Sequence, residues 1–116
     1  MRETIPGVQR LPDAKYTFIV VGVPEKIKLD SGHTKRIWTL QYYEGTEKKQ
    51  KKLHLFPSDY MPIVLAIGGE KKGADVDWDD EEVDGKAFSC DLKSVKSKDG
   101  KYENYRFENC EETVPF

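Results

Sequence analysis

The sequence lacks the features that would assign it to a membrane, a metal centre or a disulfide-stabilised class. It has no apolar run of membrane-spanning length, and it does not begin with a charged segment followed by an apolar one. Only two cysteines occur, Cys90 and Cys110, and neither belongs to a CxxC motif, so we expect free thiols rather than a disulfide. His33 and His54 stand alone, without the spacing of metal ligands. We therefore expect a cytoplasmic protein without a metal site.

Motifs that carry common enzyme chemistry are also missing. There is no GxSxG, no glycine-rich phosphate loop and no HExxH, and neither cysteine has a histidine near it in the sequence. Glu47-Lys48-Lys49 after Asp30 loosely suggests a metal-dependent nuclease triad, but this spacing arises readily by chance in a chain so rich in Glu and Lys. We expect a non-catalytic protein that needs no cofactor.

Charge is distributed unevenly along the 116 residues, although the net charge is only −2. The segment 70–84 holds eight acidic residues and two lysines, which leaves 17 basic and 13 acidic residues elsewhere and a net charge of +4 there. Three aspartates at alternate positions from Asp75 have the spacing that begins a calcium-binding loop. Asp80 then stands where that loop needs glycine, and Lys86 where it needs glutamate, so we expect a solvated acidic loop instead.

The composition indicates one domain with a thin core, because 37% of the residues are hydrophobic and 34% are charged. Runs rich in β-branched and aromatic residues, separated by turn residues, predict five strands with a helix after the third. The predicted elements are strands at 15–23, 36–43, 48–56, 86–95 and 102–110, and a helix that opens at Pro57-Ser58-Asp59 and stops at Gly68-Gly69. Alternation along the second strand places Trp38, Leu40 and Tyr42 on one face.

This order of elements is that of the OB-fold, a five-stranded, partly open barrel, here with one helix between strands 3 and 4. We therefore predict a mainly β protein built on such a barrel. Residues 1–14 are predicted as an N-terminal arm, 15–110 as the OB-fold domain with an acidic loop at 70–84, and 111–116 as an acidic C-terminal tip. Residues 25–35 are predicted as a charged loop. OB-folds bind oligonucleotides on the face of strands 2 and 3 and on adjoining loops.

Basic residues interleave with aromatic residues where such a barrel binds nucleic acid. An ammonium group neutralises a phosphate without demanding one geometry, and stacking of a base on an aromatic ring is worth about 1–3 kcal/mol. The predicted nucleic-acid-binding residues are Lys28, Lys35, Arg36, Trp38, Tyr43, Lys49, Lys51, Lys52, His54, Phe56, Lys96, Lys98, Tyr102 and Arg106. Two alternatives stay open: Trp38 belongs to the core instead, or the lysine run 48–52 is a solvated edge that discourages strand pairing.

The chain ends in acidic residues followed by an apolar tip, Glu-Glu-Thr-Val-Pro-Phe. This tip resembles that of bacterial single-stranded DNA-binding proteins, in which acidic residues precede Ile-Pro-Phe and recruit replication and repair enzymes. The predicted partner-binding residues are Glu111, Glu112, Val114, Pro115 and Phe116. The tip departs from the bacterial form because Val114 replaces the isoleucine and no long Gly/Gln-rich linker precedes it. The alternative is a strand end whose Val114 and Phe116 pack on the body.

Over residues 11–116 the chain resembles small phage-encoded single-stranded DNA-binding proteins. The resemblance rests on the proline-led first strand, a first loop with Lys and Gly, the helix that ends in Gly68-Gly69, and Gly85-Lys86 before the fourth strand. It implies a protein of the host cytoplasm that binds single-stranded DNA with little sequence preference during replication, recombination or repair, and it is compatible with a homo-oligomer. The alternative is a protein interaction module or inhibitor whose acidic segment 74–84 imitates nucleic acid.

Overall fold

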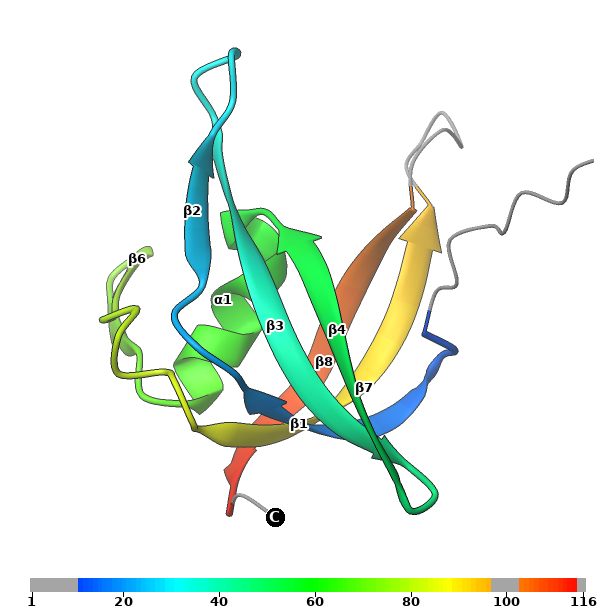
Figure 1. The fold of residues 1–116 in the computed structure, drawn as a ribbon. Coiled ribbons are helices and arrows are strands. Elements are labelled where there is room, and N and C mark those ends of the chain that lie inside the picture. The colour runs from blue at the N-terminus through cyan, green and yellow to red at the C-terminus, as the bar shows by residue number, and fades with distance from the viewer. Residues whose placement is uncertain (1–10, 97–102, 115–116) are drawn as a thin grey trace, which may run out of the picture.

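The computed structural model describes residues 11–96 and 103–114 and contains one helix between strands (Figure 1). In chain order the elements are β1 (Ala14–Val20), β2 (Glu25–Lys28), β3 (Thr34–Glu44), β4 (Glu47–Leu55), α1 (Pro57–Ala66), β5 (Glu70–Lys72), β6 (Asp75–Asp77), β7 (Ala87–Lys96) and β8 (Glu103–Thr113). The mainly β class and the helix after the third long strand are thus as predicted from the sequence.

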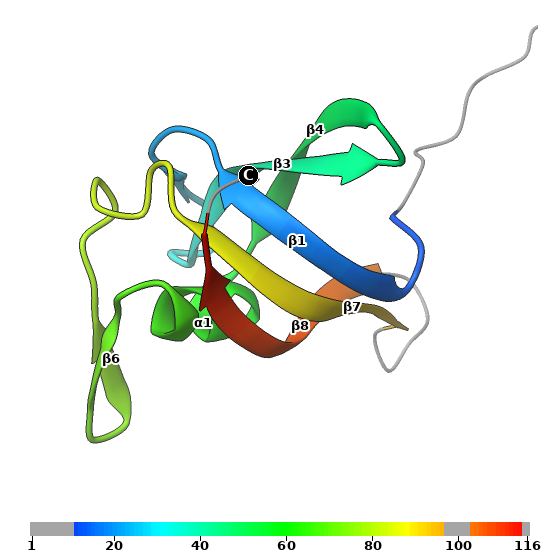
Figure 2. The ribbon, with the colours of Figure 1, turned by 90° about the horizontal axis from the view of Figure 1, so that it is seen from below.

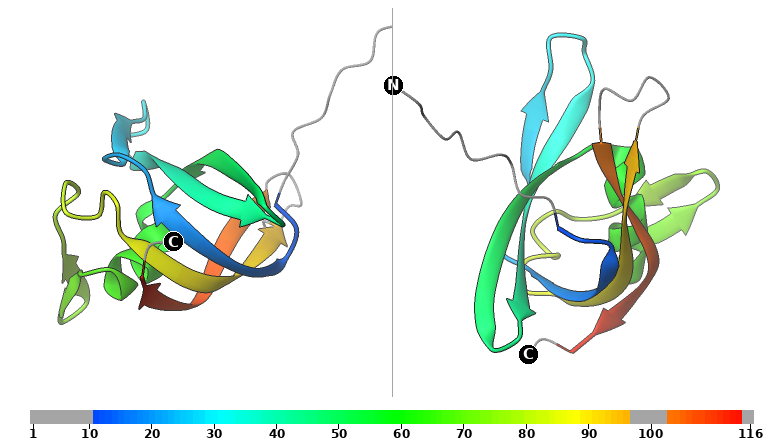
Figure 3. Two further views of the ribbon diagram at one scale, coloured as in Figure 1. Left: turned by 60° about the horizontal axis from the view of Figure 1, so that its bottom comes forward. Right: turned by 90° about the vertical axis from the view of Figure 1, so that its right-hand side faces the viewer.

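Six strands form one antiparallel sheet in the order β2-β3-β1-β7-β8, with β4 paired to β3, while β5 and β6 form a separate two-stranded ribbon. The long strand β3 pairs with two strands on the same edge: β2 lies along its first half, where Glu25 is opposite Ile37, and β1 follows, where Ile19 is opposite Gln41. The sheet is strongly curved (Figures 2 and 3). No pairing joins β4 to β8 within the described residues. Instead, α1 packs against β8 and also reaches β3 and β4.

The core lies on the inner, concave side of this sheet, between the sheet and α1. Trp38, Leu40 and Tyr42 are buried along β3, which confirms the face predicted from their alternation. Trp38 is fully buried and stacks on Trp78 with the ring centroids 5.8 Å apart. The ring centroid of Tyr60, in α1, lies 5.4 Å from the ring centroid of Trp38. These rings join the sheet, the helix and the acidic segment in one cluster.

The helix α1 begins where Phe56 adopts an extended conformation and caps the first turn. The Phe56 backbone N–H donates to the Asp59 carboxylate at 3.0 Å, and Pro57 occupies a first-turn position, where its missing N–H is not needed. Burial raises the pKa of the Asp59 carboxyl, although it accepts this hydrogen bond. Pro62 lies inside the helix, beyond its first turn, because α1 begins at Pro57.

Three segments differ from the sequence prediction. The predicted loop 25–35 contains β2, the predicted acidic loop 70–84 contains the β5–β6 ribbon, and the predicted strand 102–110 continues as β8 to Thr113. The residues of β2, β5 and β6 are mostly charged and exposed, so hydrophobic alternation does not reveal them. These elements form by pairing with the next or the preceding strand in the chain, β2 with β3, β5 with β6, and β8 with β7.

The two cysteines are free thiols on the adjacent strands β7 and β8, as expected from the sequence. The β7–β8 pairing is irregular beside Cys90, and Asn109 adopts a positive φ of 52° there, which is the geometry of a β-bulge. The two thiols are hydrogen bonded to each other. This contact and burial raise the pKa of Cys90, and the same contact lowers the pKa of Cys110.

We expect Gly69→Ala to lower the free energy of unfolding by about 1–3 kcal/mol, the usual cost of overpacking. A Cβ at this position would lie 2.6 Å from Val64 Cγ1 and 2.8 Å from the Val64 carbonyl oxygen. The backbone is held there because the Gly69 N–H donates to that oxygen at 2.7 Å. Urea unfolding measures the effect, with the exposed neighbour Glu70→Ala as the control. Equal stability of the two variants would contradict the close contact.

Candidate nucleic-acid interface

The side of β3 and β4 that faces away from the core forms a continuous surface, which we call the outer face. Cross-strand pairing sets Tyr43 opposite Lys48 and Thr39 opposite Lys52. The outer face consists of Lys35, Ile37, Thr39, Gln41 and Tyr43 on β3 and of Lys48, Gln50, Lys52 and His54 on β4. None of these residues carries a carboxylate, whereas Asp and Glu outnumber Lys and Arg over the whole chain. The outer face is therefore locally basic.

One end of the outer face carries an exposed aromatic ring beside a surface hollow. Tyr43 is 44% exposed, and the hollow next to it has a volume of about 350 Å³. Lys15, Tyr16 and Thr17 of the adjacent strand β1 complete its lining. Two lysines thus adjoin Tyr43: Lys15 of β1 shares the hollow with it, and Lys48 of β4 is its cross-strand partner.

The other end of the outer face carries a second exposed aromatic ring. Phe56 follows β4 directly and is 41% exposed. It borders a surface hollow of about 590 Å³ whose other lining residues are Gly32, His33, Thr34, Pro57 and Ser58. Tyr43 and Lys35 are eight positions apart on β3, and at a rise of about 3.3 Å per residue the two ends are roughly 26 Å apart. A surface of this length accommodates several nucleotides of a single-stranded nucleic acid.

The predicted lysine run on β4 divides between the two sides of the sheet. Lys48 and Lys52 lie on the outer face, whereas Lys49 and Lys51 share the inner side with the buried Leu53. Lys49 Nζ donates to Glu44 Oε2 at 2.9 Å, and this hydrogen bond raises the pKa of Lys49. The prediction that Lys49 and Lys51 join Lys52 on one nucleic-acid surface is therefore wrong for the outer face, because alternate strand residues point to opposite sides.

Trp38 was predicted to stack on a base, and its position contradicts this. The side chain has no exposed surface and packs between Trp78 and Tyr60. A base cannot reach the indole without unfolding this cluster. Of the two interpretations that the sequence left open for Trp38, the core interpretation is correct.

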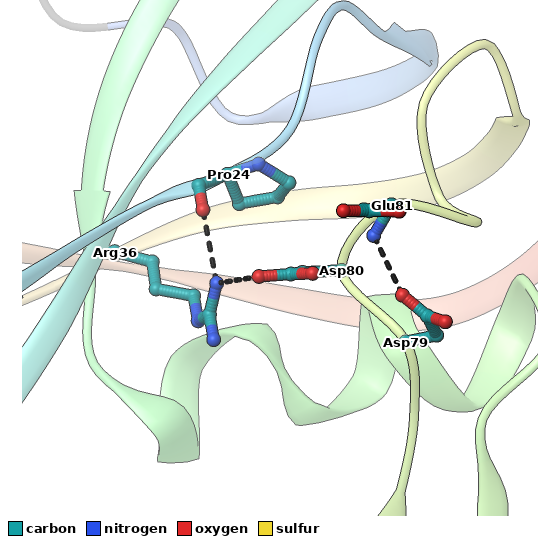
Figure 4. Close-up of polar contacts among 5 residues, drawn as sticks. All are labelled: Pro24, Arg36, Asp79, Asp80 and Glu81. Atoms are coloured by element: carbon teal, nitrogen blue, oxygen red, sulfur yellow. Dashed lines mark hydrogen bonds and ion pairs between the residues drawn. The ribbon is translucent and has the colours of Figure 1, made fainter.

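Arg36 was also predicted to contact nucleic acid, but it lies on the inner side and holds the acidic segment in place (Figure 4). One guanidinium nitrogen, Nη1, donates to Asp80 Oδ2 at 2.9 Å and to the Pro24 carbonyl oxygen at 2.9 Å. The guanidinium carbon lies 4.8 Å from the centroid of a Trp78 ring, which is a cation–π distance. Asp79 caps the following turn by accepting a hydrogen bond from the Glu81 N–H at 2.9 Å.

The remaining predicted nucleic-acid residues lie away from the outer face or outside the described residues. Lys28 is opposite Thr34 at the end of β2 and is exposed. Arg106 lies on β8, where its guanidinium is 3.8 Å from the Glu108 carboxylate. Lys96 ends β7, and its side chain is not described, while Lys98 and Tyr102 lie outside the described residues. The outer face thus retains Lys35, Tyr43, Lys52 and His54 of the predicted set, with Phe56 at its end.

The predicted C-terminal tip is shorter than expected. Glu111 and Glu112 belong to β8 and lie opposite Ser89 and Phe88 of β7. Val114 follows the strand and is 81% exposed. Pro115 and Phe116 lie outside the described residues. The alternative interpretation is therefore correct in that the acidic pair belongs to a strand, and wrong in that Val114 does not pack on the body.

The nucleic-acid-binding residues predicted from the sequence include neither Lys15 nor Lys48. The signal for Lys48 was present, because a period of two along β4 groups it with Lys52 and His54. Lys15 could not be found in this way, since its proximity to Tyr43 depends on the pairing of β1 with β3.

Within residues 11–96 and 103–114, no three His, Cys, Asp or Glu side chains gather closely enough to hold a metal ion. The single helix α1 has 10 residues, and no described helix is long and apolar enough to cross a membrane. Comparison with models of known protein families finds no match, and comparison with curated protein sequences also finds none.

We expect the Arg36–Asp80 pair to couple by about 1 kcal/mol in a double-mutant cycle of unfolding free energies, the upper range for partly exposed ion pairs. The Arg36 side chain is 15% exposed and the Asp80 side chain 38%. The cycle uses Arg36→Ala, Asp80→Ala and the double variant. The Lys49–Glu44 pair has the same 2.9 Å separation but 37% and 68% exposure, and it should couple more weakly. Equal coupling energies for the two pairs would contradict the expectation that the less exposed Arg36–Asp80 pair is the stronger one.

Proposed function

We propose that this chain is a non-catalytic single-stranded DNA-binding protein that acts in replication, recombination or repair. The observation that carries this proposal is the outer face of β3 and β4, which combines lysines with an exposed aromatic ring at each end and has no carboxylate. Single-stranded nucleic acid is bound by this combination, because cations track the phosphates while bases stack on rings.

The order of the long strands supports an OB-fold as the finer description of the sheet. If β1, β3, β4, β7 and β8 are taken as the five strands, their pairing order is β4-β3-β1-β7-β8 and α1 lies between the third and fourth. A partly open Greek-key barrel with this order binds oligonucleotides on its second and third strands, which here are β3 and β4. The β2 hairpin then belongs to the connection between the first two barrel strands, which also contributes to binding in such folds.

The chemistry of the outer face favours binding with little sequence preference. Lys35, Lys48 and Lys52 carry flexible ammonium groups that neutralise phosphates from several directions. Tyr43 and Phe56 offer rings that accept any base. Between them, Thr39 and Gln41 supply neutral polar groups, and the outer face includes no arginine, the side chain most suited to bidentate recognition of guanine. Coating and protection of single strands follow from this arrangement.

The acidic segment has less support as an imitation of nucleic acid, because several of its carboxylates make internal contacts. Asp80 binds Arg36, Asp79 accepts the Glu81 N–H, and Asp84 accepts the Gly22 N–H at 2.8 Å. The bonds to Arg36 and Gly22 fasten the segment to the body of the protein, and the bond from Asp79 holds a turn within the segment. Recruitment of replication or recombination proteins through the C-terminal tip stays a prediction, with Val114 as its one described residue beyond β8.

Titration of labelled oligonucleotides at several salt concentrations tests the proposal. We expect single-stranded DNA to bind, with log affinity falling linearly with log salt at a slope of about −0.7 for each phosphate contacted. Mixed-sequence and homopolymer strands should bind within about tenfold of one another, since stacking depends weakly on base identity. Absence of binding to single strands at low salt would overturn the proposed function.

Point variants on the outer face test where the DNA lies. Tyr43→Ala should weaken binding by about 5- to 150-fold, which corresponds to a stacking contribution of about 1–3 kcal/mol. Lys52→Gln should lower the salt slope by about one phosphate contact. Lys71→Gln, on the exposed ribbon strand β5, removes the same charge elsewhere and should leave the slope unchanged. A larger effect from Lys71→Gln than from Lys52→Gln would exclude the outer face as the interface.

A further inference from the structure

A groove runs between α1 and the segment that contains β6, and the proposed DNA interface does not use it. Its volume is about 370 Å³, within the usual range of ligand sites. The lining residues are Pro57, Tyr60, Met61 and Val64 from α1 and Ala74, Asp75, Val76, Asp77 and Trp78 from the second segment. The β5–β6 ribbon projects from the body beside the helix (Figures 1 and 2). Residues 74–78 form the second wall of the groove.

The helix wall of the groove is apolar and in part exposed. Its residues are spaced by three, one and three positions, which places them on a single face of α1. Met61 is 38% exposed although it is an apolar side chain. A ligand that buried this wall would remove apolar surface from water, which is the main favourable contribution to most protein association.

The opposite wall is acidic. Asp75 and Asp77 line the groove and are exposed, and no Lys, Arg or His is among the described residues that line it. Lys72, on the neighbouring strand β5, forms an ion pair with Asp77, with 2.7 Å between Lys72 Nζ and Asp77 Oδ2. This ion pair offsets part of the negative charge. The segment 70–84 nevertheless keeps a large acidic excess. A cationic ligand is therefore favoured over a neutral or anionic one.

The groove follows the edge of β6 rather than one of its faces. Alternate residues would line it if it lay over a face, because successive side chains of a strand point to opposite sides. Instead, the five consecutive residues 74–78 line it, and no residue of β5 does so within the described chain. Because β6 pairs only with β5 among the described strands, its other edge lacks a partner strand. An edge of this kind can pair with an added strand.

We propose that this groove docks an extended segment of a partner protein, one that carries Lys or Arg beside aliphatic residues and that pairs with β6 as an added strand. Backbone hydrogen bonds to the β6 edge align the segment. An aliphatic side chain covers Met61 and Val64, and a basic side chain meets Asp75 and Asp77. Main-chain pairing supplies affinity in this mode of recognition, and side-chain contacts supply specificity.

The groove and the outer face lie on different sides of β3. Tyr60, which lines the groove, contacts Trp38 on the inner side of that strand, whereas Tyr43 and Lys52 lie on the outer side. A bound partner segment and bound DNA therefore do not compete for the same surface. This arrangement suits a protein that holds a single strand while a basic partner segment is attached to it.

Fluorescence anisotropy with a labelled, capped peptide, Lys-Val-Arg-Leu-Lys-Val, tests the proposal on the full chain. We expect saturable binding that weakens as salt is raised. The same peptide with N-methyl groups on alternate backbone amides keeps its charges and side chains but loses hydrogen-bond donors, and it should bind at least about tenfold more weakly if strand pairing aligns it. A Glu-Val-Asp-Leu-Glu-Val peptide should not bind.

Two variants of one helix provide a matched comparison. Met61→Lys places a cation in the groove and should weaken peptide binding by about tenfold or more. Leu65→Lys changes a residue of similar exposure, 40% against 38%, that does not line the groove, and it should bind as the unaltered protein does. Asp75→Asn with Asp77→Asn should weaken binding about three- to tenfold. Near-UV circular dichroism confirms that each variant is folded.

The outcomes separate clearly. Loss of binding in Met61→Lys but not in Leu65→Lys, together with weak binding of the N-methylated peptide, supports a strand docked in the groove. Equal binding of the methylated and unmodified peptides overturns strand pairing. Equal binding by the two lysine variants overturns the groove as the site, and so does the absence of peptide binding to the unaltered protein. Oligonucleotide titration of the two lysine variants reports on the DNA interface independently, since neither Met61 nor Leu65 lies on the outer face.

Discussion

The packing of Trp38 against Trp78 and Tyr60 is the interaction on which the rest of the structure depends. These three rings come from the sheet, the acidic segment and the helix, three parts of the chain that share no strand pairing. The Trp38 indole Nε1 has no hydrogen-bond partner among the described residues. Apolar burial and ring contact therefore hold the cluster together. Truncating a fully buried aromatic residue of this size costs about 3–5 kcal/mol in general, a large fraction of the stability of a small domain.

The position of Trp38 also fixes the two sides of β3. Since Trp38 points inward, Thr39 and Tyr43 point outward, and the paired strand β4 brings Lys48 and Lys52 to the same side. On the inner side, Arg36 binds Asp80 and lies over Trp78. The basic outer face and the acidic segment are thus kept on opposite sides of one strand. A chain with a small net charge thereby presents two surfaces of opposite charge, for which we propose nucleic acid and a basic peptide as the respective ligands.

Much of the fold could be predicted from local patterns. The long strands, the helix after the third of them and the inward face of Trp38, Leu40 and Tyr42 follow from β-propensity, turn residues and alternation. The short strands β2, β5 and β6 could not be predicted, because exposed charged residues show no apolar period. The extension of β8 to Thr113 was also hidden, since Glu111 and Glu112 resemble a solvated tail until β7 pairs with them.

The candidate site was predicted in part, and its errors have a common cause. Composition and spacing alone determined that lysines and aromatic residues concentrate in the chain around β3 and β4, and that acidic residues concentrate in 70–84. Only the tertiary structure decided which of them share a surface: Lys49 turns inward beside Glu44, Arg36 binds Asp80, and Lys15 joins Tyr43 from another strand. Residue type is a local property of the chain, whereas a binding surface is defined by which strands pair and by the side of the sheet to which each residue points.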